Sequence, residues 1–118
     1  MLRKTREWLE EWQLTDKIRE LPSKEIIKDL EKYKPLKCVN LFRGINDRKD
    51  LQQERKKKLR SFTYSEGLAR VIACGDLDVD DISKCKGVII KKKICPKKIL
   101  IDFNRLDEEN IDEVIVLR

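Results

Sequence analysis

The first third of the chain places apolar residues at helical spacing. Trp8, Leu9 and Trp12 recur three and four positions apart with glutamates around them, which predicts an amphipathic helix. A break follows, and Ser23 is placed to cap a second helix by accepting a hydrogen bond from a free backbone N–H. The apolar positions of that second helix are Ile26, Ile27, Leu30 and Tyr33. The helix is expected to end before Pro35, and both apolar stripes are expected to pack on a sheet, so we assign them no chemistry.

Beyond position 36 the pattern changes to short apolar runs that are typical of strands. The run Cys-Val-Asn-Leu-Phe at 38–42 predicts a strand that ends at Arg43-Gly44. Three further strands are predicted over residues 88–94, 99–103 and 114–117. Because helices come first and strands predominate later, the predicted class is α+β, with N-terminal helices packed on a mostly antiparallel sheet.

The segments between these strands are more polar. Residues 46–60 predict a solvated loop or a short helix, and Ser65 is placed to cap a helix that ends at Gly75. The apolar positions of this helix are Leu68, Val71 and Ile72. The acidic run 76–81 lacks the central glycine and the terminal glutamate of a calcium loop, so it predicts a loop or one helical turn. Residues 107–112 are expected to connect the last two strands. A length of 118 residues predicts a single domain, with a helical part over 1–36 and a core over 37–118.

The charge of the chain leaves two interpretations open. The net charge is +6, and residues 55–60 form the basic run Arg-Lys-Lys-Lys-Leu-Arg. Such a run attracts nucleic acid, nucleotide phosphates or acidic protein surfaces. A lysine-rich, solvated surface without a partner is the plainer interpretation.

The cysteines and the absence of histidine exclude several kinds of site. There are four cysteines, separated by about ten residues or more, and tight metal sites use ligands that are closer together, so no metal site is expected. Without histidine, hydrolase triads with a histidine base are excluded. Cys38 and Cys95 lie in apolar runs, where a thiol usually acts as a small buried hydrophobe. No segment has the roughly 20 apolar residues that span a bilayer, and no signal-peptide core is present, so we expect a cytoplasmic monomer with reduced thiols and no membrane contact.

Three positions carry side chains that suit a dinucleotide with a labile glycosidic bond. Arg43 offers a planar fork of donors that matches phosphate oxygens. Ser61 and Thr63 provide hydroxyls that orient a ribose or a carboxylate. Glu113 opens the last strand, and a carboxylate there is able to stabilise positive charge that develops at a sugar carbon. Nicotinamide leaves without protonation, so the lack of histidine is no obstacle.

These stretches resemble a known family. Leu-Phe-Arg-Gly at 41–44, Ser-Phe-Thr-Tyr-Ser-Glu-Gly-Leu-Ala at 61–69 and Glu-Val-Ile-Val at 113–116 resemble, in that order, the arginine–serine–glutamate class of ADP-ribosyltransferases. The run 96–102 is similar to the strand that precedes the catalytic one in that class. The resemblance covers residues 38–118 and implies a split β-sheet core that binds NAD as a substrate, as in small phage- or toxin-like members. It further implies an effector that acts inside a cell, with host cytoplasm as one setting.

The resemblance also implies roles for individual residues. Glu113, Ser61 and Arg43 would be the catalytic set, with Glu113 on the ribose 2′-hydroxyl and Ser61 orienting the glutamate or the nicotinamide ribose. The residues expected to contact NAD are Arg43, Gly44, Ser61, Phe62, Thr63 and Tyr64. The Gly44 backbone would hold the nicotinamide amide. The expected reaction is mono-ADP-ribosyl transfer to a protein or nucleic acid.

Other functions and acceptors remain open. Members that modify arginine carry Glu or Gln two residues before the catalytic glutamate, whereas this chain has Ile111, so arginine is not the favoured acceptor. Water as acceptor would make the protein an NAD hydrolase, and loss of NAD binding would make it an inactive relative. The alternative from a different class is a non-catalytic basic module that binds nucleic acid or a host protein.

Overall fold

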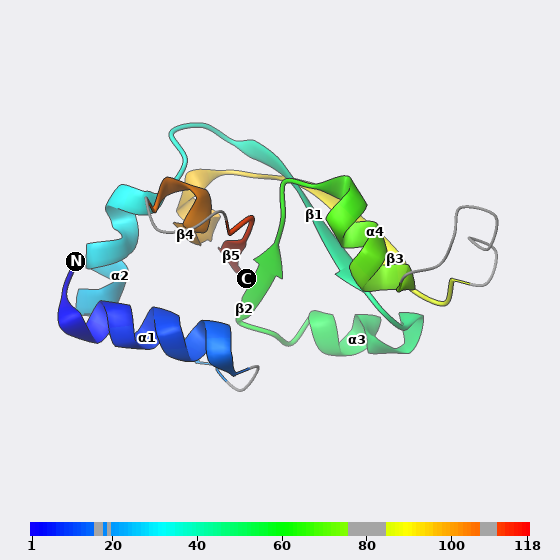
Figure 1. Ribbon diagram of the computed structural model, residues 1–118, viewed down its shortest axis with the longest axis horizontal. Helices are drawn as coiled ribbons and strands as arrows, with labels where there is room; N and C mark the ends of the chain where they lie inside the picture. The colour runs from blue at the N-terminus through cyan, green and yellow to red at the C-terminus, as the bar shows by residue number, and fades with distance from the viewer. Residues whose placement is uncertain (16–17, 19, 76–84, 107–110) are drawn as a thin grey trace.

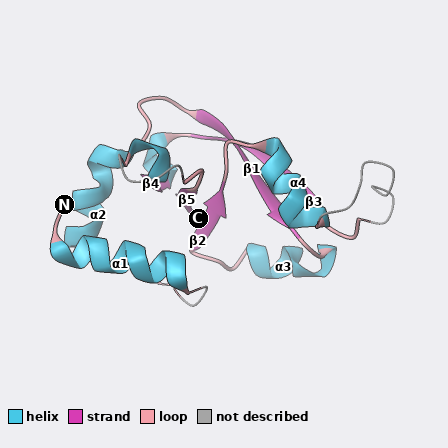
Figure 2. Ribbon diagram, in the orientation of Figure 1, coloured by secondary structure: helices cyan, strands magenta, loops and turns pink. Residues whose placement is uncertain are grey.

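The computed structural model describes residues 1–15, 18, 20–75, 85–106 and 111–118 (Figure 1). Its helices and two small antiparallel sheets confirm the α+β class (Figure 2). The acidic run 76–81 and most of the connection 107–112 lie outside the described residues. Among the described residues, no helix combines the length and apolar composition that crossing a membrane requires.

The amino-terminal part is helical, as predicted. Helix α1 spans Arg3–Leu14, helix α2 spans Lys24–Leu30, and a 3-10 turn, η1, continues over Glu31–Tyr33. The Ser23 hydroxyl accepts a hydrogen bond from the Ile26 N–H at 3.4 Å, so the predicted cap is confirmed. Both helices lie at the end of the molecule that also holds β4 and β5 (Figure 1).

The strands form two separate sheets. In the first, β1 (Val39–Ile45) pairs antiparallel with β3 (Val88–Ile94). The second has the order β2–β5–β4, with β2 at Leu59–Phe62, β5 at Val114–Leu117 and β4 at Ile99–Asp102. The predicted limits of β3 and β5 are confirmed, whereas Phe103 begins the 3-10 turn η5 (Phe103–Arg105) instead of ending β4. Other short elements in the described part of the chain are η2 (Arg48–Asp50), α3 (Leu51–Glu54) and η4 (Pro96–Lys98).

The predicted end of the first strand at Arg43-Gly44 is wrong. The ladder between β1 and β3 continues through Gly44↔Ile89 to Ile45↔Val88, so the backbone stays paired to the end of β1. Arg43 therefore lies inside a strand, where its side-chain direction is fixed by the pleat. This placement aims the guanidinium at β2 instead of leaving it on a turn.

Strand β5 has both faces buried, which explains its continuous apolar run. Val114 and Val116 pack in the cluster between the two sheets, with Leu41 of β1 and Phe62 of β2. Ile115 points the other way and joins the cluster beneath α1 and α2. Because side chains alternate along a strand, residue 113 lies on the same face of β5 as Ile115, toward the amino-terminal helices.

Helix α4 (Glu66–Cys74) begins and ends as predicted. Ser65 caps it by accepting from the Leu68 N–H at 3.1 Å, and Gly75 ends it with a φ of 73°. The helix packs closely on β1, because a Cβ at Gly44 would lie only 2.1 Å from the Ala69 carbonyl oxygen. The residues of α4 that are buried are Ala69 and Ala73, whereas the side chains of Leu68, Val71 and Ile72 are largely exposed.

The cysteines are paired, so the prediction of reduced thiols is wrong. Cys38 and Cys95 form one disulfide, and Cys74 and Cys85 form a second. Cys38 comes directly before β1 and Cys95 directly after β3, so the antiparallel register brings them opposite each other. Cys38 is exposed instead of being a buried hydrophobe. Disulfides are typical of oxidising environments and do not support the predicted cytoplasmic location.

Candidate functional site

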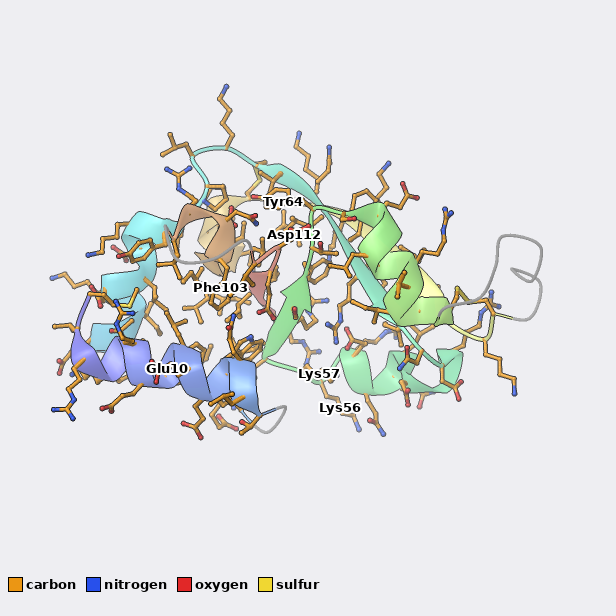
Figure 3. The ribbon with its side chains drawn as sticks, in the orientation of Figure 1. Glu10, Lys56, Lys57, Tyr64, Phe103 and Asp112 are labelled. Carbon is orange, nitrogen blue, oxygen red and sulfur yellow. A yellow bond between two sulfur atoms is a disulfide. The ribbon has the colours of Figure 1, made fainter. Side chains whose placement is uncertain are left out.

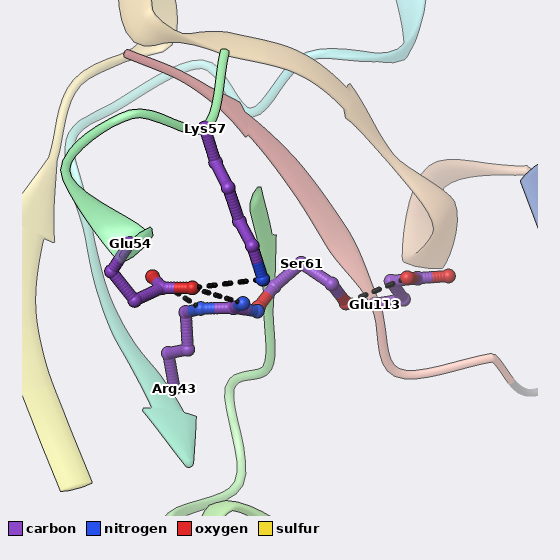
Figure 4. A network of polar contacts seen from close by, with 5 residues as sticks. All are labelled: Arg43, Glu54, Lys57, Ser61 and Glu113. Carbon is purple, nitrogen blue, oxygen red and sulfur yellow. Dashed lines mark hydrogen bonds and ion pairs between the residues drawn. The ribbon is translucent and has the colours of Figure 1, made fainter. Parts of the chain in front are cut away.

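The site centres on a contact between β2 and β5. In the antiparallel register Ser61 lies opposite Ile115, so the side chains of Ser61 and Glu113 lie on the same face of the sheet. The Ser61 hydroxyl donates a hydrogen bond to Glu113 Oε2 at 2.6 Å (Figure 4). Two of the three residues expected to act together are therefore in direct contact.

Arg43 joins the same network from β1. Its Nη1 donates to the Ser61 carbonyl oxygen at 2.7 Å. Its Nε and Nη2 donate to the two carboxylate oxygens of Glu54, at 2.8 Å and 2.6 Å (Figure 4). This paired geometry is the strong form of an arginine–carboxylate contact. The side chains of Arg43 and Glu54 are only 16% and 6% exposed, so the pair is a buried anchor for β2.

Glu54 keeps its charge in this buried position. Burial raises the pKa of the Glu54 carboxyl, but the hydrogen bonds and charges of Arg43 and Lys57 more than offset that effect and leave the pKa below its ordinary value. The Lys57 ammonium lies 3.2 Å from Glu54 Oε1. The guanidinium of Arg43 is thus held by a permanent carboxylate near neutral pH.

Helix α1 contributes Trp12 to the site. The indole Nε1 of Trp12 donates to Glu113 Oε2 at 3.0 Å, and the ring stacks on Trp8 with centroids 5.8 Å apart. Oxygen Oε2 of Glu113 therefore accepts two hydrogen bonds. Within the described part of the chain, Oε1 accepts none and remains available to a hydroxyl donor.

A pocket of about 970 Å³ opens beside this network. It is lined by Trp12, Gln13, Thr15, Ile18, Glu20, Arg43, Gln53, Lys56, Lys57, Lys58, Leu59, Arg60, Ser61 and Glu113. Its volume is at the upper end of the range of small-molecule and cofactor sites. Arg43, Ser61 and Glu113 all line it, so the three predicted residues meet at one pocket.

Arg60 supplies an unpaired donor in this pocket wall. Its guanidinium lies over the Phe62 ring at 5.4 Å, and its buried Nε has no hydrogen-bond partner among the residues that the structure describes. Burial lowers the pKa of Arg60 from its ordinary value. A buried donor without a partner is unfavourable, and the guanidinium adds a positive charge to the pocket wall.

The other residues expected to contact a dinucleotide do not line this pocket. Gly44 is covered by α4, and Phe62 is buried between the two sheets. Thr63 donates to Asp112 Oδ2 at 2.7 Å. Tyr64 faces a separate hollow of about 550 Å³ that it shares with Asp102 and Asp112.

Thr63 and Tyr64 instead hold the segment that leads to Glu113. The Tyr64 N–H donates to Asp112 Oδ1 at 3.1 Å, next to the Thr63 bond, and its hydroxyl donates to Asp102 Oδ2 at 2.6 Å. Burial and the Asp102 carboxylate raise the pKa of the Tyr64 hydroxyl, so it remains a donor at ordinary pH. These bonds tie the residue before Glu113 to the end of β2, which fixes the position of that glutamate.

Sequence reasoning missed Trp12 and Glu54, whereas Arg60 belongs to the basic run 55–60, for which phosphate contact is one of the interpretations left open. The helical spacing of Trp12 predicts a packing residue, but a buried indole N–H usually requires an acceptor, and that requirement is the signal for a polar partner. Glu54 lies in a polar stretch just before the basic run, where a surface position is the ordinary expectation. Within the described ranges, no group of three or more His, Cys, Asp or Glu side chains is placed to hold a metal ion.

Comparison with known proteins gives this chain no relatives. No protein-family model, curated protein or solved structure matches it. The pocket itself offers a fixed carboxylate, a hydroxyl bonded to one of its oxygens, an indole wall and an excess of cationic side chains.

Proposed function

We propose that this chain is an ADP-ribosyltransferase that uses NAD as its substrate and Glu113 as its catalytic carboxylate. The observation that carries the proposal is the 2.6 Å bond from Ser61 to Glu113, made at a pocket that Arg43 also lines. Ser61 and Glu113 are 52 positions apart in the chain, and their direct contact supports the joint role that the sequence resemblance implies for them. The two small antiparallel sheets agree with the split-sheet core of that family.

The pocket residues fit the groups of NAD by their chemistry. The free Oε1 of Glu113 suits a ribose 2′-hydroxyl, which donates to it, and the negative charge stabilises positive charge at the adjacent anomeric carbon. Arg60, a cation of the pocket wall, suits the pyrophosphate.

Arg43 acts as a positioning residue in this proposal. Its Nε, Nη1 and Nη2 all donate within the protein, so it holds Glu54 and β2 instead of gripping a phosphate. Through the Ser61 carbonyl it fixes the strand whose hydroxyl orients Glu113. The direct phosphate contact expected of Arg43 passes to Arg60.

In the reaction, Glu113 stabilises the sugar while the bond from C1′ to the nicotinamide nitrogen breaks. Nicotinamide leaves with the electron pair of that bond. The nucleophilic atom of the acceptor forms the new bond at C1′ and releases its proton to solvent. When water is the acceptor, the same two bond changes give free ADP-ribose.

The test is nicotinamide release from NAD by wild-type protein and by Glu113→Gln, which keeps the size of the side chain and removes its charge. Removing such a stabilising group should lower turnover by about 100-fold or more. Glu10→Gln is the matched control, because Glu10 is exposed on α1 (Figure 3). Equal turnover by Glu113→Gln and wild type would contradict the proposal. So would the absence of nicotinamide release by the wild-type protein under every condition tested.

A non-catalytic basic module is the second candidate. The observation that favours it is the complete engagement of Arg43 by Glu54 and Ser61, because a structural role explains that residue without any ligand. This candidate predicts that NAD leaves the melting temperature unchanged. A ligand at a hundred times its dissociation constant stabilises a protein by about 2.7 kcal/mol, so a thermal shift with NAD decides against it.

A further inference from the structure

The walls of the pocket carry an excess of cationic side chains. Five lysine and arginine residues line it, against the two carboxylates of Glu20 and Glu113. Three of the five are consecutive lysines on the connection between α3 and β2. We call Lys56, Lys57 and Lys58 the lysine rim. Figure 3 labels Lys56 and Lys57, which lie between α3 and β2.

The positive charge of the lysine rim is only partly neutralised. Lys57 contacts the Glu54 carboxylate, which Arg43 already engages, so this trio carries a net positive charge. Lys58 pairs with Glu20 at 2.7 Å, but the two side chains are 54% and 77% exposed, and such pairs are weak. In the part of the chain that the structure describes, no carboxylate pairs with Lys56. The rim is therefore able to bind several anionic groups at once.

The ring of Trp12 favours a nucleic acid over other anionic partners. Trp12 is half-buried and lines the same pocket as the rim. A positive surface beside an aromatic ring is the arrangement by which proteins hold single-stranded nucleic acid, with phosphates on the cations and a base on the ring. An acidic peptide would bind the lysines but would not stack on the ring. A cationic acceptor such as an arginine side chain would be repelled by the rim.

We propose that the lysine rim binds the phosphate backbone of a single-stranded nucleic acid, which presents the acceptor atom to the pocket. The role of that strand as acceptor rests on the proposed transferase function, whereas its binding does not. A nucleophilic nitrogen or oxygen of the strand bonds to C1′ of the ADP-ribose as nicotinamide leaves, and its proton passes to solvent.

The binding test uses fluorescently labelled single-stranded DNA and RNA oligonucleotides without NAD. Lys56→Gln/Lys58→Gln is compared with Lys92→Gln/Lys93→Gln, which removes the same charge from two exposed lysines of β3. Each phosphate contact adds about 0.7 to the slope of log affinity against log salt, so the rim variant should lower that slope by about 1.4. At about 0.1 M salt its affinity should fall on the order of 10-fold, and the β3 variant should bind like wild type.

Three results would overturn the inference. The first is an equal loss of affinity in the two variants, which would mean that binding depends on the net charge of the protein and not on the position of the lysines. The second is loss in the β3 variant alone, which places the nucleic-acid surface on β3. The third is polyglutamate competing as well as the oligonucleotide at equal charge, which assigns the rim to acidic proteins.

A second assay separates this inference from the proposed function. Oligonucleotide and NAD are incubated together, and both nicotinamide release and ADP-ribose on the strand are measured by mass spectrometry. Modified strand with wild type, and at least 10-fold less with the rim variant, supports both proposals. Rim-dependent binding without nicotinamide release supports the nucleic-acid site and contradicts the transferase. Nicotinamide release that leaves the strand unmodified supports the NAD site and overturns the acceptor assignment.

Discussion

Ser61 Oγ and Glu113 Oε2 lie 2.6 Å apart, although 52 residues separate them along the chain. The contact follows from the antiparallel pairing of β2 with β5, because that register sets both side chains on one face of the sheet. A slip of one residue in either strand would turn one of them to the other face. The position of the carboxylate is therefore a property of the sheet and not of a flexible loop.

Replacing Ser61 with alanine should weaken catalysis without unfolding the protein. The variant removes a hydrogen bond to a charged group, a loss of about 1.5–3 kcal/mol, which corresponds to about 10- to 100-fold in turnover. Ser65→Ala is the control, since the Ser65 hydroxyl caps α4 away from the pocket and its loss costs about 1 kcal/mol of stability. We expect Ser65→Ala to have a lower melting temperature than wild type but to release nicotinamide at the wild-type rate. Undiminished release by Ser61→Ala would show that the hydroxyl has no part in orienting Glu113.

The elements around this contact were largely predictable from the sequence. The apolar runs of β3 and β5 and the caps at Ser23 and Ser65 depend on local patterns, and the structure has them where those patterns indicate. Local patterns do not reveal which face of a helix remains exposed. Helix α4 shows this, because its close approach to Gly44 buries Ala69 and Ala73 and leaves Leu68, Val71 and Ile72 largely exposed.

Contacts made between elements were not predictable. The partner of Arg43 is Glu54, which comes from a polar stretch that has no apolar period, so nothing in the local sequence marks Glu54 as buried. The cysteine pairing depends likewise on tertiary structure. Cys38 and Cys95 are 57 positions apart, and only the β1–β3 register brings them together.

The Arg43–Glu54 pair makes the stability of the fold depend on pH. Because the pKa of Glu54 is below its ordinary value of 4.5, its contribution is complete above that pH and is lost as the pH falls through the lowered pKa. Glu54→Gln leaves a buried guanidinium without its counter-charge, and we expect a loss of about 3–5 kcal/mol at pH 7. Urea unfolding at pH 7 and at pH 3 measures both effects.

The control for this prediction is Glu25→Gln. Glu25 forms an exposed ion pair with Lys4, so its replacement should change stability by about 1 kcal/mol or less. The stability of wild type should fall more steeply on acidification than that of Glu54→Gln, because only wild type carries the titrating carboxylate. Parallel pH profiles for the two proteins would mean that the pair does not contribute to the acid sensitivity of the fold.

The two disulfides should stabilise the protein to different extents. A disulfide stabilises the fold by restricting the unfolded chain, and the effect grows with the length of the closed segment. We expect about 4 kcal/mol from Cys38–Cys95, which are 57 positions apart, and about 3 kcal/mol from Cys74–Cys85, which are 11 positions apart. Urea unfolding of Cys38→Ser/Cys95→Ser and Cys74→Ser/Cys85→Ser measures the two losses separately. Mass spectrometry after alkylation without reductant should detect no free thiol in wild type. Four alkylated cysteines in protein purified under oxidising conditions would contradict both pairings.

Trp12→Phe tests whether the amino-terminal helix belongs to the catalytic machinery. Phenylalanine keeps an aromatic ring against Trp8 but lacks the N–H that donates to Glu113, so turnover should fall by about 10-fold or more while the melting temperature changes little. Trp8→Phe is the matched control, and it should release nicotinamide like wild type. In that control Trp12 is the sole remaining tryptophan, so NAD should change its fluorescence. Equal turnover by the two variants would show that Trp12 only packs against its neighbours and that α1 contributes no catalytic residue.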